Sequence, residues 1–134
     1  MDRDLQAKGE KARRAVLGDA YVDTAFANAD QFSLPFQDVL NEYCWGQCWT
    51  DDGLSLKQRS LLNLGMLAAL GRMHEFKTHF RGAIRNGLGD AELRAALIQI
   101  AVYCGVPAGV EAFRVAREVR QEMASEAAGG KGGS

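Results

Sequence analysis

Apolar side chains recur along nearly every segment of this chain at spacings of three and four residues. Such periodicity is typical of amphipathic helices that bury one face. Fifteen glycines and two prolines separate the periodic segments. The pattern predicts an all-α protein with helices at residues 3–17, about 19–29 and 33–49, in LKQRSLLNLGMLAALG, MHEFKTHFRGAIRNG and AELRAALIQIAVYCG, and from near Pro107 to about Met123.

Residues that favour helix ends support several of these boundaries. Ser33, Ser55 and Asp90 each stand at the start of a predicted helix, where a short polar side chain can accept from an unpaired backbone N–H. Pro107 lies near the first turn of the last helix, where its missing N–H costs no hydrogen bond. Gly87, followed by a leucine, is typical of a helix that ends on glycine.

The predicted helices differ in how much of their surface is apolar. The first two are mostly polar, and we expect each to pack on a neighbour rather than to form the core. Residues 61–70 are apolar on nearly every side, so that helix lies either at the centre of the domain or in a subunit interface. The next helix has a narrower stripe, which predicts its buried face: Phe76, Phe80, Ala83 and Ile84.

Composition narrows the function classes. A formal net charge of −1, without a basic surface, argues against nucleic acid as a partner. The N-terminus is charged and no apolar run approaches the roughly 20 residues that cross a bilayer, so we expect a cytoplasmic protein without a membrane segment. The length predicts one domain, 1–124, followed by a disordered glycine-rich segment, 125–134.

Three cysteines, Cys44, Cys48 and Cys104, are too few for a disulfide framework, and we expect them to be reduced. Cys44 and Cys48 stand one helical turn apart, but a structural zinc site needs about four ligands and no second pair exists. No phosphate-binding glycine loop, HExxH or GxSxG motif is present. We therefore expect neither a metal nor one of the common cofactors.

A polar cluster, Arg72, Glu75 and His79, occupies adjacent turns at the start of one predicted helix. One interpretation is a solvated face on which Glu75 and His79 form a weak pair. The other places His79 at the mouth of an apolar pocket, oriented by Glu75, with Arg72 or Arg59 supplying positive charge. His74 lies off the apolar stripe, and we expect it to be exposed without a catalytic task.

Arg59 and a group of aromatic residues are further candidates. Arg59 begins the most apolar helix, where an arginine needs an anionic partner, which is either a ligand or a nearby acid. Tyr43 and Trp45 either pack in a core or interface or line a pocket. Gly46 lies inside a helical pattern at a cost of up to about 1 kcal/mol relative to alanine, which indicates a close backbone approach or a local break.

Four segments in order, NEYCWG at 41–46, RSLLNLGMLAALGR at 59–72, EFKTHFRGAIRNG at 75–87 and AVYCGVPAGVEAF at 101–113, resemble the 4-carboxymuconolactone decarboxylases. The resemblance extends over most of residues 5–122. It implies a single-domain helical fold of about six helices, shared with alkylhydroperoxidase D-like proteins. It also implies a ring-forming homo-oligomer, commonly a hexamer, which agrees with a helix that is apolar on all sides.

The resemblance also separates this chain from its peroxidase relatives. Those proteins have a Cys-x-x-Cys motif with a histidine four residues after the second cysteine. Here His79 keeps the histidine position, while Arg72 and Glu75 occupy the two thiol positions and cannot form a disulfide. A hydroperoxidase, or a helical assembly that binds a small molecule without catalysis, is the alternative. Gln47 stands where relatives often have glutamate.

The implied reaction is cofactor-independent decarboxylation of the dianionic 4-carboxymuconolactone to 3-oxoadipate enol-lactone, in the β-ketoadipate pathway of aromatic catabolism. The alternative substrate is a related lactone acid. The lactone receives the electrons that carbon dioxide leaves behind, so the protein must anchor anions, stabilise an oxyanion and protonate carbon. On this reading Arg59 and Arg72 bind carboxylates, His79 donates the proton with Glu75 orienting it, and Tyr43 and Trp45 line the pocket.

Overall fold

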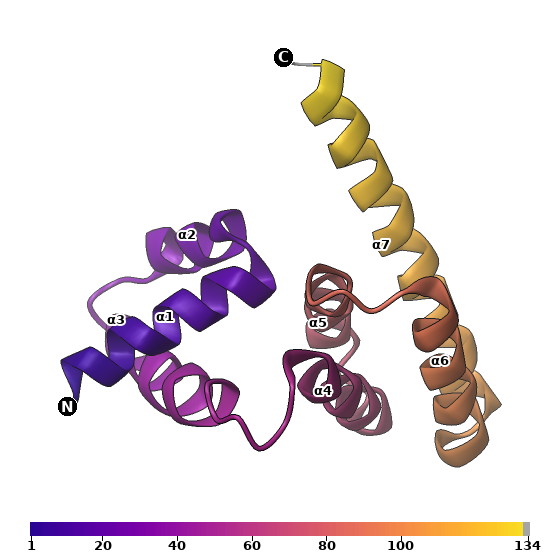
Figure 1. Ribbon diagram of the computed structural model, residues 1–134, viewed down its shortest axis with the longest axis horizontal. Coiled ribbons are helices and arrows are strands. Elements are labelled where there is room, and N and C mark those ends of the chain that lie inside the picture. The colour runs from indigo at the N-terminus through magenta and orange to yellow at the C-terminus, as the bar shows by residue number, and fades with distance from the viewer. Residues whose placement is uncertain (133–134) are drawn as a thin grey trace. The chain divides into compact units, whose positions relative to one another are not determined.

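The computed structural model describes residues 1–132, and every regular element among them is helical (Figure 1). The all-α prediction is therefore confirmed, with seven α-helices and one π-helical segment in this range against about six helices expected. The chain forms two compact units, Met1–Arg59 and Ser60–Ser134. The elements in order are α1 (Arg3–Leu17), α2 (Asp19–Asn28), α3 (Leu34–Val39), the π-helix η1 (Leu40–Trp49), α4 (Leu56–Leu70), α5 (Met73–Arg85), α6 (Asp90–Cys104) and α7 (Val106–Gly132).

The core of the first unit is formed where α1 packs along η1. Trp45 and Trp49 of η1 stack with their ring centroids 4.7 Å apart. They pack against Val16 and Leu17 near the end of α1, and all four side chains are buried. The expectation that the first helix only packs beside a core is therefore wrong, because α1 supplies half of the core of its unit.

Residues 34–49 form a continuous helical stretch whose hydrogen-bonding pattern changes at Leu40. The segment is α-helical to Val39 and π-helical from Leu40 to Trp49. A Cβ atom on Gly46 would lie 2.7 Å from the Leu5 carbonyl oxygen and 2.8 Å from that of Asn41. The prediction made from Gly46 is confirmed, since a local change of helix type and a close backbone approach to α1 occur together.

Buried polar side chains also connect α1 with α3 and η1. The Arg13 guanidinium donates to Gln37 Oε1 at 2.8 Å and to Asn41 Oδ1 at 3.2 Å. Burial lowers the pKa of Arg13. The buried carboxylate of Glu42 accepts from the backbone N–H of Asp2 at 2.5 Å. These bonds satisfy several of the groups that the packing of α1 on η1 removes from water, whereas the buried Nε of Arg13 has no hydrogen-bond partner among the described residues.

The second unit has a larger apolar core to which α4, α5, α6 and α7 all contribute. The predicted stripe of α5 is confirmed, because Phe76, Phe80 and Ala83 are buried and Ile84 packs against the same core. Residues 61–70 are not buried on every side of this chain. Leu64 and Ala68 face the core, whereas the other face is exposed to solvent: Leu62, Met66 and Leu70.

The helix ends follow the predicted chemistry with two exceptions, at Ser33 and Asp90. Ser33 precedes α3, but its Oγ accepts from the Asp30 backbone N–H and not from a backbone N–H of that helix. Ser55 Oγ accepts from the Gln58 backbone N–H while the Gln58 side chain accepts from that of Ser55. Gly87 has a φ of 96° and ends the turn after α5. Asp90 is not the N-cap of α6, which begins at Asp90 with Gly89 as its cap. The Asp90 carboxylate instead forms an ion pair with Arg120 at 2.9 Å.

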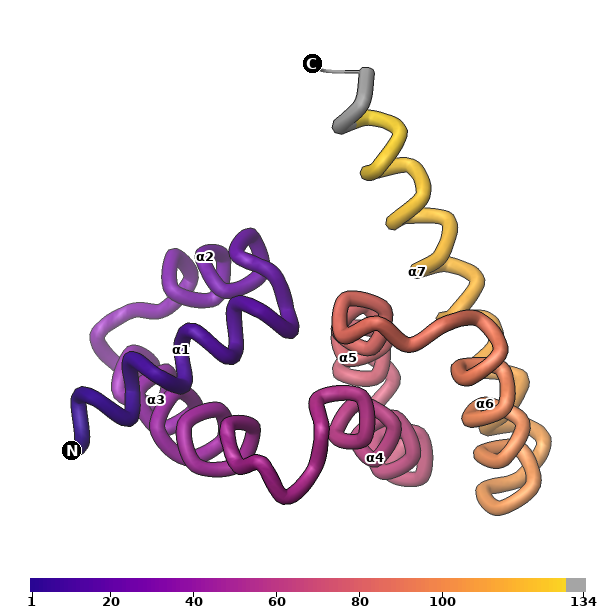
Figure 2. The backbone as a smooth tube through the Cα atoms, in the orientation of Figure 1, coloured from indigo at the N-terminus to yellow at the C-terminus, as the bar shows by residue number. Residues whose placement is uncertain are grey.

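The last helix is longer than its sequence suggests (Figure 2). We expected it to end near Met123 and 125–134 to be disordered, but α7 continues to Gly132, and 133–134 lie outside the described residues. One residue of the added turns, Glu126, forms an ion pair with Arg81 of α5. Lys77 and Arg81 pair with acidic residues spaced four apart along α7, Glu118, Glu122 and Glu126. Among the described helices, none is both long and apolar enough to cross a membrane.

Candidate functional site

His79 lies on α5, partly buried, next to the buried Phe80. Its Nδ1 is 3.4 Å from Nδ2 of Asn63, which is on α4. Burial is the larger influence on the imidazole and lowers its pKa, while the negative charge of Glu75 acts in the opposite direction and raises it. At neutral pH the imidazole is therefore mainly neutral, in a site where a second anion would favour protonation.

Asn63 is the residue of this group that the sequence interpretation missed. It stands within 61–70, where every other side chain is apolar or absent, and it is only partly buried. An amide in such a segment needs a polar partner, because burying it without one costs free energy. This lone polar position was a signal available in the sequence, but the identity of the partner depends on how α4 packs on α5.

Glu75 and Arg72 are both exposed. Glu75 is one turn before His79 on α5 and affects the imidazole through its charge. Arg72 precedes the first turn of α5, where its backbone carbonyl accepts from Phe76 N–H at 2.9 Å. His74 is exposed, as expected. The second unit thus brings together a histidine, an amide and a carboxylate, with an arginine at the start of the same helix.

Arg59 lies in the first turn of α4, and its side chain is 11% exposed. One terminal nitrogen, Nη2, donates to the backbone oxygen of Asp51 at 3.0 Å and to Oδ2 of Asp51 at 3.3 Å. The other, Nη1, is 3.6 Å from the Cys48 sulfur, and the buried Nε has no hydrogen-bond partner. The structure therefore gives Arg59 the acid partner that one of the two interpretations required.

The aromatic candidates of η1 differ in exposure. Tyr43 is 55% exposed, whereas Trp45 is 3% exposed and lies in the core of the first unit against Trp49. Core packing thus explains the position of Trp45. Of these two aromatic residues, Tyr43 is the one whose side chain is accessible to a ligand. Gln47 is exposed.

The three cysteines are free and exposed. No group of three or more histidine, cysteine, aspartate or glutamate side chains within the described range is arranged to hold a metal ion.

The model of the carboxymuconolactone decarboxylase family matches residues 35–118. This chain belongs to that family. The matched range includes part of each compact unit, so both contribute to the domain that defines the family. It also contains every candidate residue named above, from Tyr43 to His79, and the family resemblance inferred from the four sequence segments is confirmed.

Two proteins similar to this chain have names that state an activity. The chain is 42% identical over 123 residues to the nitrosuccinic acid decarboxylase npaB of Metarhizium robertsii, covering 92% of this chain and 86% of that protein. It is 32% identical over 122 residues to the 4-carboxymuconolactone decarboxylase of Acinetobacter baylyi, covering 91% of each. Both relatives are named as decarboxylases of small acids, and they differ in the acid.

Proposed function

We propose that this protein decarboxylates a small dicarboxylic acid, with nitrosuccinate as the first candidate substrate. The observation that carries the proposal is the 42% identity, over 92% of the chain, to a nitrosuccinic acid decarboxylase. The lower identity of 32% to a 4-carboxymuconolactone decarboxylase makes that lactone the second candidate. The nitro acid thus takes precedence over the lactone that the sequence segments first suggested.

The two candidate substrates share the feature that decarboxylation requires. Each has two carboxylates, and one of them is attached where the electrons of the breaking bond can move into an acceptor within the same molecule. In nitrosuccinate the acceptor is the nitro group on the same carbon. In the lactone it is the ring carbonyl, reached through the ring double bond. The protein then has to bind anions, stabilise charge on oxygen and deliver a proton to carbon.

For nitrosuccinate the step balances without another reactant. The bond between the nitro-bearing carbon and its carboxylate breaks, carbon dioxide leaves, and the electron pair forms a nitronate. One proton then adds to the same carbon and gives 3-nitropropanoate. The charge moves from a carboxylate to the nitro oxygens in the transition state, so donors near those oxygens accelerate the reaction more than donors to the departing carboxylate.

His79 is the proposed proton donor. Its partly buried ring is held at Nδ1 by the Asn63 amide, which fixes the orientation of the imidazole. Burial favours the neutral ring, and Glu75 opposes it. A bound dianion adds to the effect of Glu75, so substrate binding and proton uptake by His79 favour one another. The proton taken up in this way is the one delivered to carbon.

Arg59 and Arg72 are the proposed carboxylate-binding residues. Guanidinium groups suit this role because their planar donors match the two oxygens of a carboxylate. In the free protein Asp51 already occupies Nη2 of Arg59, so a substrate carboxylate has to replace or share that contact. Arg72 is exposed and needs no such exchange. Tyr43 is proposed to contact the substrate, with Trp45 supporting it from the core.

The test is incubation of the purified full chain with nitrosuccinate, followed by mass spectrometry of 3-nitropropanoate and a carbon dioxide assay, against a blank without enzyme. We expect turnover by the wild type and a loss of about 10²- to 10⁴-fold in His79→Ala. The matched control is His74→Ala, an exposed histidine on the same helix, which should retain full activity. Equal activity of His79→Ala and wild type would remove His79 from the mechanism.

The second substrate is tested in parallel with 4-carboxymuconolactone generated in situ, followed by ultraviolet absorbance. If only the lactone were turned over, 4-carboxymuconolactone would replace nitrosuccinate as the proposed substrate. Turnover of neither acid would contradict the proposed function.

Arg59→Lys should raise KM more than it lowers kcat, since it keeps the charge but loses the planar pair of donors. Arg14→Lys is the control, because Arg14 pairs with three carboxylates within the same unit.

A further inference from the structure

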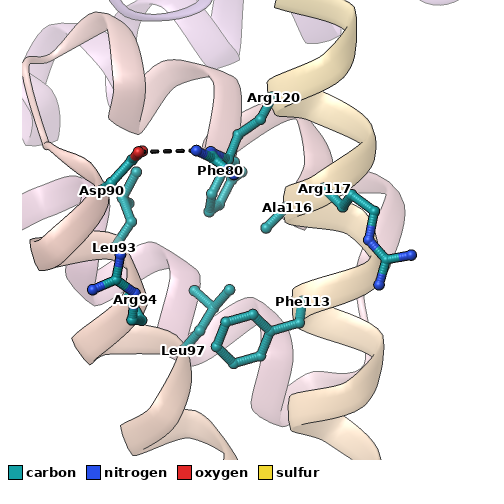
Figure 3. A pocket seen from close by; sticks show the side chains of 9 residues that line it. All are labelled: Phe80, Asp90, Leu93, Arg94, Leu97, Phe113, Ala116, Arg117 and Arg120. Atoms are coloured by element: carbon teal, nitrogen blue, oxygen red, sulfur yellow. Dashed lines mark hydrogen bonds and ion pairs between the residues drawn. The ribbon is translucent and has the colours of Figure 1, made fainter.

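A cavity of about 240 Å³ lies between α6 and α7 in the second unit, and none of the residues assigned to decarboxylation line it (Figure 3). Its apolar wall comes from both helices and from Phe80 of α5. On α6 the wall residues are Leu93 and Leu97, and on α7 they are Phe113 and Ala116. This volume is below the roughly 300–1,000 Å³ of pockets for drug-sized ligands, so it suits a single ring or a short chain.

Positive charge predominates at the edge of this cavity. Arg94, Arg117 and Arg120 belong to its lining, together with one carboxylate, that of Asp90. Arg120 pairs with Asp90 at 2.9 Å, as the dashed line in Figure 3 marks. Within residues 1–132 neither Arg94 nor Arg117 forms an ion pair. Two cationic side chains therefore remain beside an apolar wall without an acidic partner.

The close-up view shows how these two arginines lie. Arg94 leaves α6 and Arg117 leaves α7, and in this view the Arg117 guanidinium extends past α7, away from the other labelled side chains (Figure 3). Both residues are exposed, so their side chains can change rotamer without disturbing the core. Either guanidinium can then turn toward an anion at the opening while the aliphatic stem stays on the wall.

We propose that this cavity binds a small organic monocarboxylate with an apolar body, of the size of benzoate. The body packs on Leu97, Phe113 and Ala116, and the carboxylate accepts from Arg94 or Arg117. Charge complementarity selects an anion, because two unpaired arginines border the opening. The apolar wall selects against inorganic anions and acetate, which have little apolar surface to bury. The inference goes beyond decarboxylation, since this ligand is held by residues that have no part in that reaction.

The experiment is calorimetric titration of the full-length wild type with benzoate, supported by saturation-transfer NMR. Two further ligands separate the contributions: benzyl alcohol has the ring without the charge, and acetate has the charge without the ring. We expect benzoate to bind at least tenfold more tightly than either. Absence of benzoate binding at millimolar concentration would overturn the proposal, as would equal binding of benzyl alcohol.

Variants locate the site. The double change Arg94→Gln and Arg117→Gln should weaken benzoate binding tenfold or more, and Ala116→Leu should fill the cavity. Arg114→Gln is the matched control on α7, because Arg114 is outside the cavity and paired with Glu111 and Glu118. It should bind benzoate as the wild type does. Equal binding by the double variant and the wild type would overturn the proposal.

A last comparison separates this cavity from the proposed active site. His79→Ala should bind benzoate with unchanged affinity, because His79 is not part of the cavity lining. Loss of benzoate binding in His79→Ala, with normal binding in the double arginine variant, would place the ligand in the catalytic site and contradict the proposal. Failure of nitrosuccinate turnover leaves the benzoate result unaffected, so the two proposals are tested independently.

Discussion

His79 is subject to two opposing influences that set its charge. Partial burial beside the core of the second unit lowers the pKa of the imidazole, and Glu75 one turn earlier raises it. A proton donor works best when its pKa is near the working pH. On the proposal that His79 donates the proton, the role of Glu75 does not require contact with the substrate, since its charge favours the protonated form of His79.

The pH dependence of the reaction tests this role of Glu75. If protonated His79 is the donor, kcat/KM falls as pH rises through the pKa of the free enzyme. Glu75→Gln removes the charge that raises this pKa, so the falling limb should move to lower pH. The measurement is a pH profile of kcat/KM for the wild type, Glu75→Gln and the control Glu111→Gln, which lies on α7 and pairs with Arg114. An unshifted limb in Glu75→Gln would contradict the argument.

The same lowered pKa predicts how stability depends on pH. An unfolded histidine titrates near pH 6.5, above the pKa of folded His79, so between these values the unfolded state binds more protons. The contribution of neutral His79 is complete above about pH 6.5 and is lost as pH falls toward the folded pKa, with a slope of at most about 1.4 kcal/mol per pH unit.

Replacement of His79 should remove this part of the acid sensitivity. The free energy of unfolding of His79→Gln is expected to decrease less than that of the wild type between about pH 7.5 and about pH 5. Urea titrations followed by circular dichroism measure it, and His74→Gln, at an exposed position, should follow the wild type. Parallel curves for the wild type and His79→Gln would show that folding does not perturb the imidazole.

Sequence reasoning reached part of the candidate site. His79 could be predicted because it borders the periodic stripe of Phe76 and Phe80, and Glu75 because one helical turn separates the two. The contact with Asn63 was not predicted, and for Arg59 an acid partner was one of two alternatives but its identity, Asp51, was not. Both join different segments of the chain, and periodicity along a single helix contains no information about such contacts.

At the scale of elements, the close approach of α1 and η1 depends on two glycines, Gly9 and Gly46. A Cβ on Gly9 would fall on the carbonyl oxygen of Asn41 and 2.6 Å from the Gly46 nitrogen. Both are backbone atoms, which cannot move aside as a flexible side chain can. Gly65 in α4 is the opposite case, because a Cβ atom added there would have no neighbour within 4 Å.

Gly9 and Gly65 give a matched pair of alanine substitutions. Gly9→Ala should destabilise the protein by about 1–3 kcal/mol or more, as overpacking does. Gly65→Ala should stabilise it by about 0.5–1 kcal/mol, since alanine favours the helix and meets no obstacle. Thermal and urea unfolding measure both. Equal stability of Gly9→Ala and wild type would mean that α1 does not lie against η1 as described.

The predicted helix boundaries were correct where residues at the helix end determine them. They were wrong where the boundary or the helix type involves contacts with a distant part of the chain. The helix at 3–17 and the starts at Leu34 and Leu56 were correct, because capping residues and glycines mark them. The π-helical segment η1 packs against α1, and the part of α7 beyond Met123 includes Glu126, which pairs with Arg81 of α5. Neither partner is visible in the local pattern.

At the scale of the whole molecule, the single chain leaves apolar surface uncovered on several helices. One side of α4 exposes Leu62, Met66 and Leu70, and the α6–α7 pair exposes further apolar residues: Ile98, Val102, Tyr103, Val106 and Val110. Large exposed apolar patches mark interaction surfaces. The alternative given for 61–70, burial in a subunit interface, therefore stays a prediction that agrees with its exposed face.

Sedimentation velocity tests this prediction on the full chain at micromolar concentration. We expect the wild type to be a homo-oligomer, with a hexamer as the expected size, because covering these side chains with a second copy removes apolar area from water. Met66→Glu and Val102→Glu should each give smaller species, since a carboxylate buried at an interface without a partner is costly. Lys57→Glu, an exposed charge reversal on α4, should leave the assembly unchanged. A monomeric wild type would contradict the prediction, and it would mean that this apolar surface stays exposed to solvent or serves a partner other than a second copy.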